Sequence, residues 1–237
     1  MHLWVVRLEA SDDNFARSRT WLSAEENARA ERFRFERHAR SYVLGRASLR
    51  ALLGSYLGRE PGQVRFAYGP QGKPALDDEA CPLRFNASNS GNLAAFAFTL
   101  GCEIGVDVEQ HRAIRDLEHI AHRFFSPEEA GELMELPATE RDAAFFNCWT
   151  RKEAYIKAMG GGLSIPLDSF RVTLRPGAEA RMVTLEGSAD RASGWTLHAF
   201  NPAPACTGAI AYPEKPRAIQ AGPIVSVDEL LGGLGSD

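Results

Sequence analysis

The order of apolar and polar positions in the first hundred residues predicts strands on both sides of a helical segment. Ser23 with Glu26 three residues later is a capping-box pattern for a helix start. Apolar spacing predicts a longer helix from about Arg37 to Tyr56. Strands are expected at HLWVVRL, within VRFAYGPQGKPAL, near Arg84–Asn86 and near Leu93–Thr99. ASNSGN is expected to be a polar loop, and Lys73 to stand on an exposed turn.

The second half begins with a strand at Ile104–Glu109 and changes to a helical pattern from His111 onward. Ser126 as a cap with Pro127 in the first turn predicts a helix start. The longest periodic helix is predicted from about Arg141 to Met159. Four later segments, SFRVTL, ARMVTLEG, WTLHAF and GAIAY, are predicted to be strands of one second sheet.

The repeated succession of strands and helices predicts an α/β (α+β) protein with two α/β lobes that meet near residue 105. We expect an N-terminal lobe at 1–105, a C-terminal lobe at 106–213 and a tail with a short helix at 214–237. The pattern alone is also compatible with a single sheet.

Composition narrows the function classes. The chain has 237 residues, of which 44% are hydrophobic and 24% charged, as in an ordinary globular protein. Its net charge of -4 disfavours a general nucleic-acid or membrane binder. No apolar run approaches the roughly 18 residues of a membrane helix, and MHLWVVRLEA lacks signal-peptide regions. With four scattered cysteines and no CxxC spacing, a reduced cytoplasmic location is expected, with the thiols buried as small apolar groups.

Basic residues are concentrated in an arginine-rich run from Arg29 to Arg50, where Glu31 and Glu36 are the only acids. Such a run is equally compatible with a solvated helix face held by ion pairs and with an anion site.

The stretch EIGVDVE places two carboxylates beside a strand pattern that predicts burial. Alternation points Ile104, Val106 and Val108 towards a core, and Asp107 and Glu109 to the other face, roughly 7 Å apart along the strand. Gly105 is expected to leave open room beside them. Acids near a core need a cation or hydrogen-bond donors. Taken alone, the DVE pattern is more typical of an exposed strand edge than of a metal site.

The helix CWTRKEAYIKAMGGG adds a third acid. Trp149, Glu153 and Lys157 are spaced by four, so they form a row at the border of the apolar face. A surface ion pair between Glu153 and Lys157 is the simpler interpretation. Together with Asp107 and Glu109, however, Glu153 would complete an oxygen site of the kind magnesium prefers. The following GGG is interpreted as a helix stop, because it lacks the phosphate-loop pattern.

The order FNASNSG, IGVDVE, FFSPEE and FFNCWTRKEAYIKAMGGGLSIPLDSF resembles the broad-specificity, two-lobed 4′-phosphopantetheinyl transferases of the surfactin-synthetase-activating type. The signatures G-[IV]-D-[IV]-E and W-[TS]-x-K-E-[AS]-x-x-K are specific together, and the resemblance covers nearly the whole chain. It implies two similar lobes related by pseudo-two-fold symmetry, with the active site in the cleft between them.

The resemblance also implies a reaction: transfer of the 4′-phosphopantetheine arm of coenzyme A to a serine of an apo acyl, aryl or peptidyl carrier protein, with release of adenosine 3′,5′-bisphosphate. Asp107, Glu109 and Glu153 match the acids that hold Mg²⁺ on the pyrophosphate. Glu153 also matches the candidate base for the serine proton, and Lys157 matches a lysine that contacts the phosphate under attack.

At the coenzyme A end, Lys73 and Ser88 match phosphate contacts. The resemblance places three arginines in the region that grips the 3′-phosphate: Arg29, Arg40 and Arg46. Asn89 departs from the family pattern, which commonly has histidine there. Because a neutral amide makes a weaker hydrogen bond than an imidazolium, our hypothesis is weaker discrimination between coenzyme A and its dephospho form.

Two other functions stay open at this stage: another magnesium-dependent phosphoryl-transfer enzyme, such as a phosphatase or nucleotidyl transferase, and an inactive carrier-binding module. Phe124, Phe125 and the segment Arg112–Arg123 are candidates for carrier docking, with ordinary packing equally expected. The sequence does not distinguish carriers of fatty acid, polyketide or nonribosomal peptide synthesis. A monomer without nucleic-acid or membrane partners is expected.

Overall fold

The computed structural model describes residues 1–233, except the side chain of Leu163. In the first lobe the elements are β1 (His2–Arg7), α1 (Asp12–Trp21), α2 (Ala24–Glu31), α3 (Glu36–Leu57), β2 (Phe66–Tyr68), β3 (Pro74–Leu76), β4 (Leu83–Ser90) and β5 (Leu93–Leu100). In the second lobe they are β6 (Gly105–Gln110), α4 (Leu117–Phe124), α5 (Pro127–Glu135), α6 (Ala138–Met159), β7 (Phe170–Val172), β8 (Met182–Leu185), α7 (Ala189–Ala192), β9 (Trp195–Phe200) and β10 (Cys206–Pro213). The tail forms β11 (Gln220–Ala221), β12 (Val225–Ser226) and α8 (Val227–Gly233).

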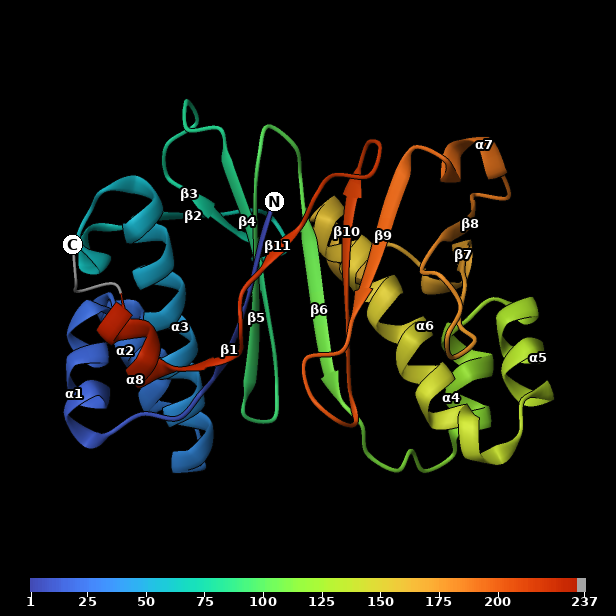
Figure 1. Ribbon diagram of the computed structural model, residues 1–237, viewed down its shortest axis with the longest axis horizontal. Helices are drawn as coiled ribbons and strands as arrows, with labels where there is room; N and C mark the ends of the chain where they lie inside the picture. The colour runs from blue at the N-terminus through green and yellow to red at the C-terminus, as the bar shows by residue number, and fades with distance from the viewer. Residues whose placement is uncertain (234–237) are drawn as a thin grey trace.

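The two lobes repeat one topology (Figure 1). Each begins with a strand, continues through two short helices and one long helix, adds a small hairpin sheet and closes with an antiparallel strand pair. The main sheets accordingly have the orders β1-β5-β4 and β6-β10-β9. The predicted fold class, two similar α/β lobes, is confirmed. We propose that the first lobe ends at residue 105 and the second at residue 213, as expected from the sequence.

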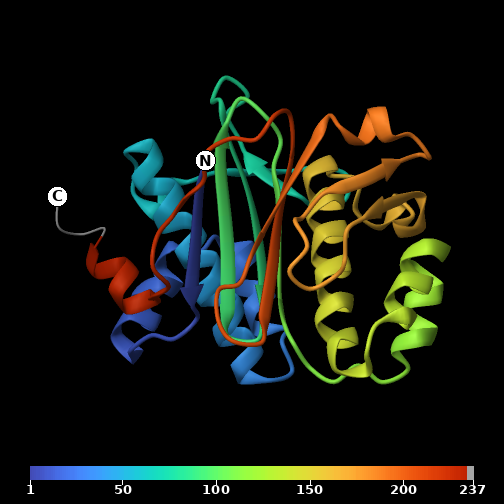
Figure 2. The same ribbon diagram turned by 45° about the vertical axis from the view of Figure 1, so that its right-hand side comes forward.

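The molecule has four layers, in the order α3, first sheet, second sheet and α6, because the strands have apolar residues on both faces. One face of the first sheet packs Phe96 and Phe98 with the long helix α3. Its other face joins the second sheet through a shared apolar layer that includes Val5, Ala95 and Val106. The helix α6 covers the outer face of the second sheet (Figure 2). The predicted inward orientation of Ile104, Val106 and Val108 is confirmed, and the lobes share a core.

The local sequence patterns predicted two helix starts and one helix end correctly. Both predicted helix starts are capping boxes, one at Ser23 and Glu26, the other at Ser126 and Glu129. The helix α6 ends at Gly160, whose φ of 70° is the left-handed conformation expected of a glycine stop. In the part of the chain that the structure describes, every helix is too short or too polar to cross a bilayer.

Two predictions about strands were wrong. The segment ASNSGN is not a loop, because Ala87–Ser90 continues β4 and pairs with β5, so that only Gly91 and Asn92 form the turn. The four later strands do not form one sheet: β9 and β10 join β6, whereas β7 and β8 form a separate pair. Strand pairing depends on partners that are distant in sequence, which local patterns do not reveal.

The tail returns to the first lobe. β11 and β12 both pair in parallel with β1. Val227, Leu230 and Leu231 of α8 are buried in the core beneath α3. The Asp228 carboxylate accepts a hydrogen bond from the backbone N–H of Ser11, at the start of α1.

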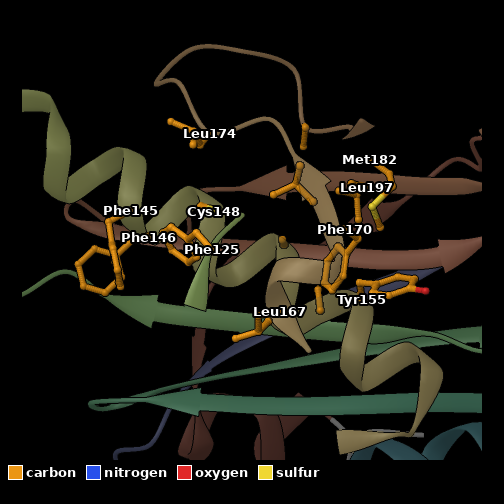
Figure 3. Close-up of a cluster of buried hydrophobic side chains, with 14 of the residues drawn as sticks. Phe125, Phe145, Phe146, Cys148, Tyr155, Leu167, Phe170, Leu174, Met182 and Leu197 are labelled. Atoms are coloured by element: carbon orange, nitrogen blue, oxygen red, sulfur yellow. The ribbon is translucent and has the colours of Figure 1, made fainter. Parts of the chain in front are cut away.

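The core of the second lobe is rich in aromatic side chains (Figure 3). Phe125 packs against Phe145 with ring centroids 5.1 Å apart. A fully buried ion pair joins Lys152 of α6 to Glu129 of α5 at 2.7 Å, and Glu129 also accepts the backbone N–H of Val172. All four cysteines are free thiols, and three of them are buried as predicted.

Candidate active site

Asp107 lies at the centre of the site, where the two lobes meet. It pairs with Ala209 of β10 and is only 4% exposed. Its Oδ1 accepts hydrogen bonds from Ser88 Oγ of the first lobe at 2.8 Å and from Lys157 Nζ at 2.7 Å. Its Oδ2 is buried and finds no partner among the described residues. A buried, unpartnered carboxylate oxygen is a position that a cation would satisfy.

Glu109 and Glu153 are half-buried beside Asp107. Burial, with the nearby charge of Asp107, raises the pKa of Glu109 against the lowering effect of a Ser90 hydrogen bond. Burial first, and then the charges of Asp107 and Glu109, raise the pKa of Glu153 against the opposing effect of Lys157. Glu153, which is distant in sequence from Asp107 and Glu109, is therefore close enough to both for an electrostatic interaction.

Within residues 1–233, no three acidic, histidine or cysteine side chains are gathered closely enough to hold a metal ion as they stand. Mg²⁺ usually keeps several waters and takes phosphate oxygens, so it does not require a complete protein cage. The donor set of carboxylates and the unpartnered Asp107 Oδ2 fit such an ion.

Lys157 faces Asp107 and not Glu153. Its ammonium donates to Asp107 Oδ1 and to Ser88 Oγ, the latter at 2.9 Å. The ion pairs of the described residues include none between Glu153 and Lys157, so the simple i,i+4 surface pair is absent. The row of Trp149, Glu153 and Lys157 does border the buried face of α6, as predicted.

The expectation of open room beside Gly105 was wrong. A Cβ at this position would lie 1.9 Å from the carbonyl oxygen of Ala154 and 2.4 Å from the backbone nitrogen of Ala158. The space is filled by the backbone of α6. The glycine therefore allows α6 to lie directly on β6, which brings Lys157 to Asp107.

Lys73 lies at the predicted exposed turn, and its own side chain is half-buried. Its ammonium donates to Glu103 Oε2 at 2.7 Å, to the carbonyl oxygen of Ala158 at 3.0 Å and to that of Ile104 at 3.3 Å. It therefore links the first lobe to the end of α6 and the start of β6. Sequence patterns could not show that these acceptors lie opposite the turn.

The other predicted phosphate contacts lie in the first lobe. Ser88 faces Asp107, whereas Asn89, the next residue on β4, is exposed. Arg46 forms an ion pair with Glu26 at 2.8 Å, and Arg40 donates to the carbonyl oxygen of Ala10 at 2.6 Å. Arg29 is exposed and stacks over Tyr42.

The sequence interpretation missed Asn86 and Ser90. Asn86 Oδ1 accepts the backbone N–H of Val106 at 2.9 Å, and Ser90 Oγ donates to Glu109 Oε2 at 2.7 Å. The polar alternation at 86, 88 and 90 was the available signal, because residues two apart share one strand face.

A groove of about 290 Å³ opens beside Glu109. Its lining consists of Glu109, Arg112, Ala113, Ile114, Arg115, Ile120, Phe145, Phe146 and Trp149. Phe124 is half-buried and packs edge-on against Trp149. Phe125 is only 2% exposed, so packing accounts for this docking candidate and the docking interpretation was wrong.

Comparison with known proteins matches both lobes to one family. A family model described as 4′-phosphopantetheinyl transferase superfamily matches residues 103–207, and one described as 4′-phosphopantetheinyl transferase, N-terminal matches residues 7–100. The 4′-phosphopantetheinyl transferase HetI of Nostoc sp. is 40% identical over 89% of this chain and 86% of its own length.

A second relative, the 4′-phosphopantetheinyl transferase Sfp of Bacillus subtilis, is 32% identical over 93% of this chain and 95% of its own length. A crystal structure of Thermotoga maritima holo-[acyl-carrier-protein] synthase is also similar. It has a TM-score of 0.36 and 16% identity, and covers 48% of this chain and 64% of that chain. That likeness is too low to support a conclusion.

The chain belongs to the 4′-phosphopantetheinyl transferase superfamily. The predicted activity is thereby confirmed: the protein transfers the 4′-phosphopantetheine arm of coenzyme A to an apo carrier protein. The two alternatives, a different phosphoryl-transfer enzyme and an inactive binding module, have no support.

Proposed function

We propose that the transfer takes place at Asp107, with Mg²⁺ held by Asp107, Glu109 and Glu153. The proposal is supported chiefly by the buried Asp107 Oδ2, which has no partner among the described residues. The charge of Asp107 contributes to the raised pKa of both Glu109 and Glu153, which also supports the proposal, since a bound cation would relieve this repulsion. When bound, Mg²⁺ would neutralise negative charge on the pyrophosphate of coenzyme A.

Glu153 is the proposed base. Its half-buried carboxylate stands at the site beside Asp107 and Glu109, and the family resemblance assigns it this role. It would take the proton of the carrier serine as the serine oxygen bonds to the β-phosphorus of coenzyme A. The bond from that phosphorus to the bridging oxygen breaks, and adenosine 3′,5′-bisphosphate leaves.

Lys157 is proposed to contact the phosphate under attack. Its Nζ is already at the site, at 2.7 Å from Asp107 Oδ1, and its side chain is 29% exposed. A positioned ammonium stabilises the negative charge that develops on the leaving group. At the far end, we propose that Lys73, Ser88 and Asn89 bind coenzyme A, together with the three arginines at positions 29, 40 and 46.

For the carrier, we propose docking at the groove beside Glu109. Its apolar floor and the guanidinium groups of Arg112 and Arg115 suit a partner with an acidic helix. Phe124, next to this groove, remains a candidate contact. Dependence on Mg²⁺, a cytoplasmic location and a monomeric state belong to the same proposal.

The decisive experiment incubates the protein with coenzyme A, Mg²⁺ and a panel of apo carriers, followed by intact-mass measurement. Modification of a carrier is expected with the wild type, and at least a hundred-fold slower modification with Asp107→Ala and Glu153→Ala. Glu140→Ala removes an exposed carboxylate from the first turn of the same helix and should transfer normally. Full activity in either site variant would contradict the assignment.

A further inference from the structure

The edge strands of the two main sheets are joined by side chains. β4 and β6 belong to different sheets. Three alternate residues of β4 nevertheless contact three positions of β6: Asn86 binds the backbone of Val106, Ser88 binds Asp107 and Ser90 binds Glu109. The first lobe therefore contacts both carboxylates of the DVE segment.

The Ser90 hydroxyl has one hydrogen-bond partner as a donor and another as an acceptor. It donates its one proton to Glu109 Oε2 at 2.7 Å and accepts the backbone N–H of Gln110 at 3.1 Å. Ser88, in contrast, is shared between Asp107 and Lys157. Ser90 thus serves one side chain of the site and the backbone next to it.

The turn after Ser90 holds it in place. Ser90 pairs with Leu93 across the hairpin, and Gly91 has a φ of 60°. A Cβ on Gly91 would lie 2.2 Å from Oε1 of Gln110, so the turn rests against the end of β6. The position of the Ser90 hydroxyl is consequently fixed by both lobes.

We propose that Ser90 is a positioning residue that orients the Glu109 carboxylate towards the cation shared with Asp107 and Glu153. The inference rests on the proposed magnesium site. A glutamate has several accessible side-chain rotamers, and a hydrogen bond to Oε2 restricts them while Oε1 remains available as a ligand. Loss of such a partner of a metal ligand typically weakens metal binding by about 10–100-fold.

The test compares Ser90→Ala, Ser90→Thr and Ser90→Val. Thr keeps the hydroxyl, whereas Val has nearly the same shape without it, and both suit a strand. Binding of Mn²⁺ in the presence of coenzyme A is measured by electron paramagnetic resonance, which needs no turnover. Transfer kinetics are then measured over a range of Mg²⁺ concentrations. Thr196→Ala is the matched control, because Thr196, on strand β9 of the sheet that contains β6, donates a 2.7 Å hydrogen bond from its Oγ1 to the backbone carbonyl of Glu214.

We expect about 10-fold weaker Mn²⁺ binding in Ser90→Ala and Ser90→Val, near-normal binding in Ser90→Thr and no change in Thr196→Ala. Excess Mg²⁺ should restore most of kcat in the weakened variants. Equal Mn²⁺ affinity in the Thr and Val variants overturns the inference, and this comparison remains valid if Ser90→Ala fails to fold. If the wild type binds no Mn²⁺, or Asp107→Ala binds it equally well, the proposed metal site itself is wrong.

Discussion

Among single residues, Asp107 is central to the site, because its two carboxylate oxygens have different surroundings. One oxygen of its carboxylate accepts bonds from both lobes, through Ser88 and Lys157. The other oxygen is buried without a partner among the described residues. Lys157 thus places a positive charge beside Asp107, and in the proposed reaction the same ammonium would turn to a phosphate.

Asn89 provides a test of co-substrate recognition. It is exposed at the end of β4, next to Ser88. Asn89→His should raise the preference for coenzyme A over its 3′-dephospho form by about 5-fold below pH 6, because a charged donor adds about 1 kcal/mol. Competition between the two compounds in the transfer assay measures this. A wild type that already prefers the 3′-phosphate strongly, with no change in the variant, would count against the hypothesis.

Glu26 provides a test of stability. Its carboxylate caps α2 at Ser23 and pairs with Arg46 and Arg50, the latter only 4% exposed. Glu26→Gln should lower the free energy of unfolding at pH 7 by about 3 kcal/mol, because it leaves Arg50 buried without a counter-charge. Urea denaturation measures the loss. Glu31→Gln, in an exposed pair on the same helix, should change stability by less than about 0.5 kcal/mol.

The effect of Glu26 should depend on pH with a definite sign. Burial raises the pKa of Glu26, but the N–H of Ser23 and the two guanidinium groups outweigh it, so the pKa lies below its ordinary value of 4.5. A lowered native pKa stabilises the fold above the unfolded-state pKa, and this contribution is lost as the pH falls through the native pKa. The difference between wild type and Glu26→Gln should therefore shrink at pH 3.5. A difference that stays constant from pH 7 to 3.5 would exclude this role.

At the scale of the element, the contact of α6 with β6 positions the second-lobe groups. Gly105→Ala should lower the free energy of unfolding by about 2–3 kcal/mol, because its Cβ would overlap the backbone of α6 at Ala154. Transfer should also slow, because any shift of α6 that relieves this overlap moves Lys157 away from Asp107. Chemical denaturation and the transfer assay measure both effects.

Gly131→Ala is the matched control for this substitution. Gly131 lies within α5, and a Cβ there would meet nothing within 4 Å. The change should raise the free energy of unfolding by about 0.5–1 kcal/mol, as expected for alanine in a helix interior. Similar effects of the two substitutions would show that close packing at Gly105 is unimportant.

Sequence reasoning succeeded where the signal was local. Ser23 and Ser126 mark helix starts because a cap bonds to a residue three positions away. It failed for Ala87–Ser90, where Ser88 and Ser90 bind side chains of β6 in the other lobe, so that the polar segment looks like a loop in isolation. The acceptors of Lys73 could not be predicted either, because Glu103 and the carbonyl of Ala158 are distant from it in sequence. Strand alternation placed Asp107 and Glu109 on one face, whereas the Ser90 hydroxyl that binds Glu109 was missed although the alternation at 86, 88 and 90 signalled it.

At the scale of the whole molecule, the tail stabilises the lobe that begins the chain. Leu230 and Leu231 are 4% and 3% exposed in the core of the first lobe. Changing both to alanine should lower the free energy of unfolding by about 5 kcal/mol or more, since each buried leucine contributes about 2–5 kcal/mol. Denaturation measured at Mg²⁺ saturation checks this. Val183→Ala, at a 37% exposed position, should have little effect, and an equally small effect of the double variant would contradict the packing.

Because the C-terminal tail packs against the first lobe, the chain cannot be divided simply into one fragment per lobe. A break between residues 105 and 106 separates the repeated units in sequence, but it leaves α8, which completes the first unit, attached to the second fragment. Neither fragment would then bury its own apolar surface, and each would also expose the layer that the sheets share. Co-expressed fragments are expected to reassemble, whereas either one produced alone should aggregate. The protein would thus make a split reporter whose signal requires both pieces.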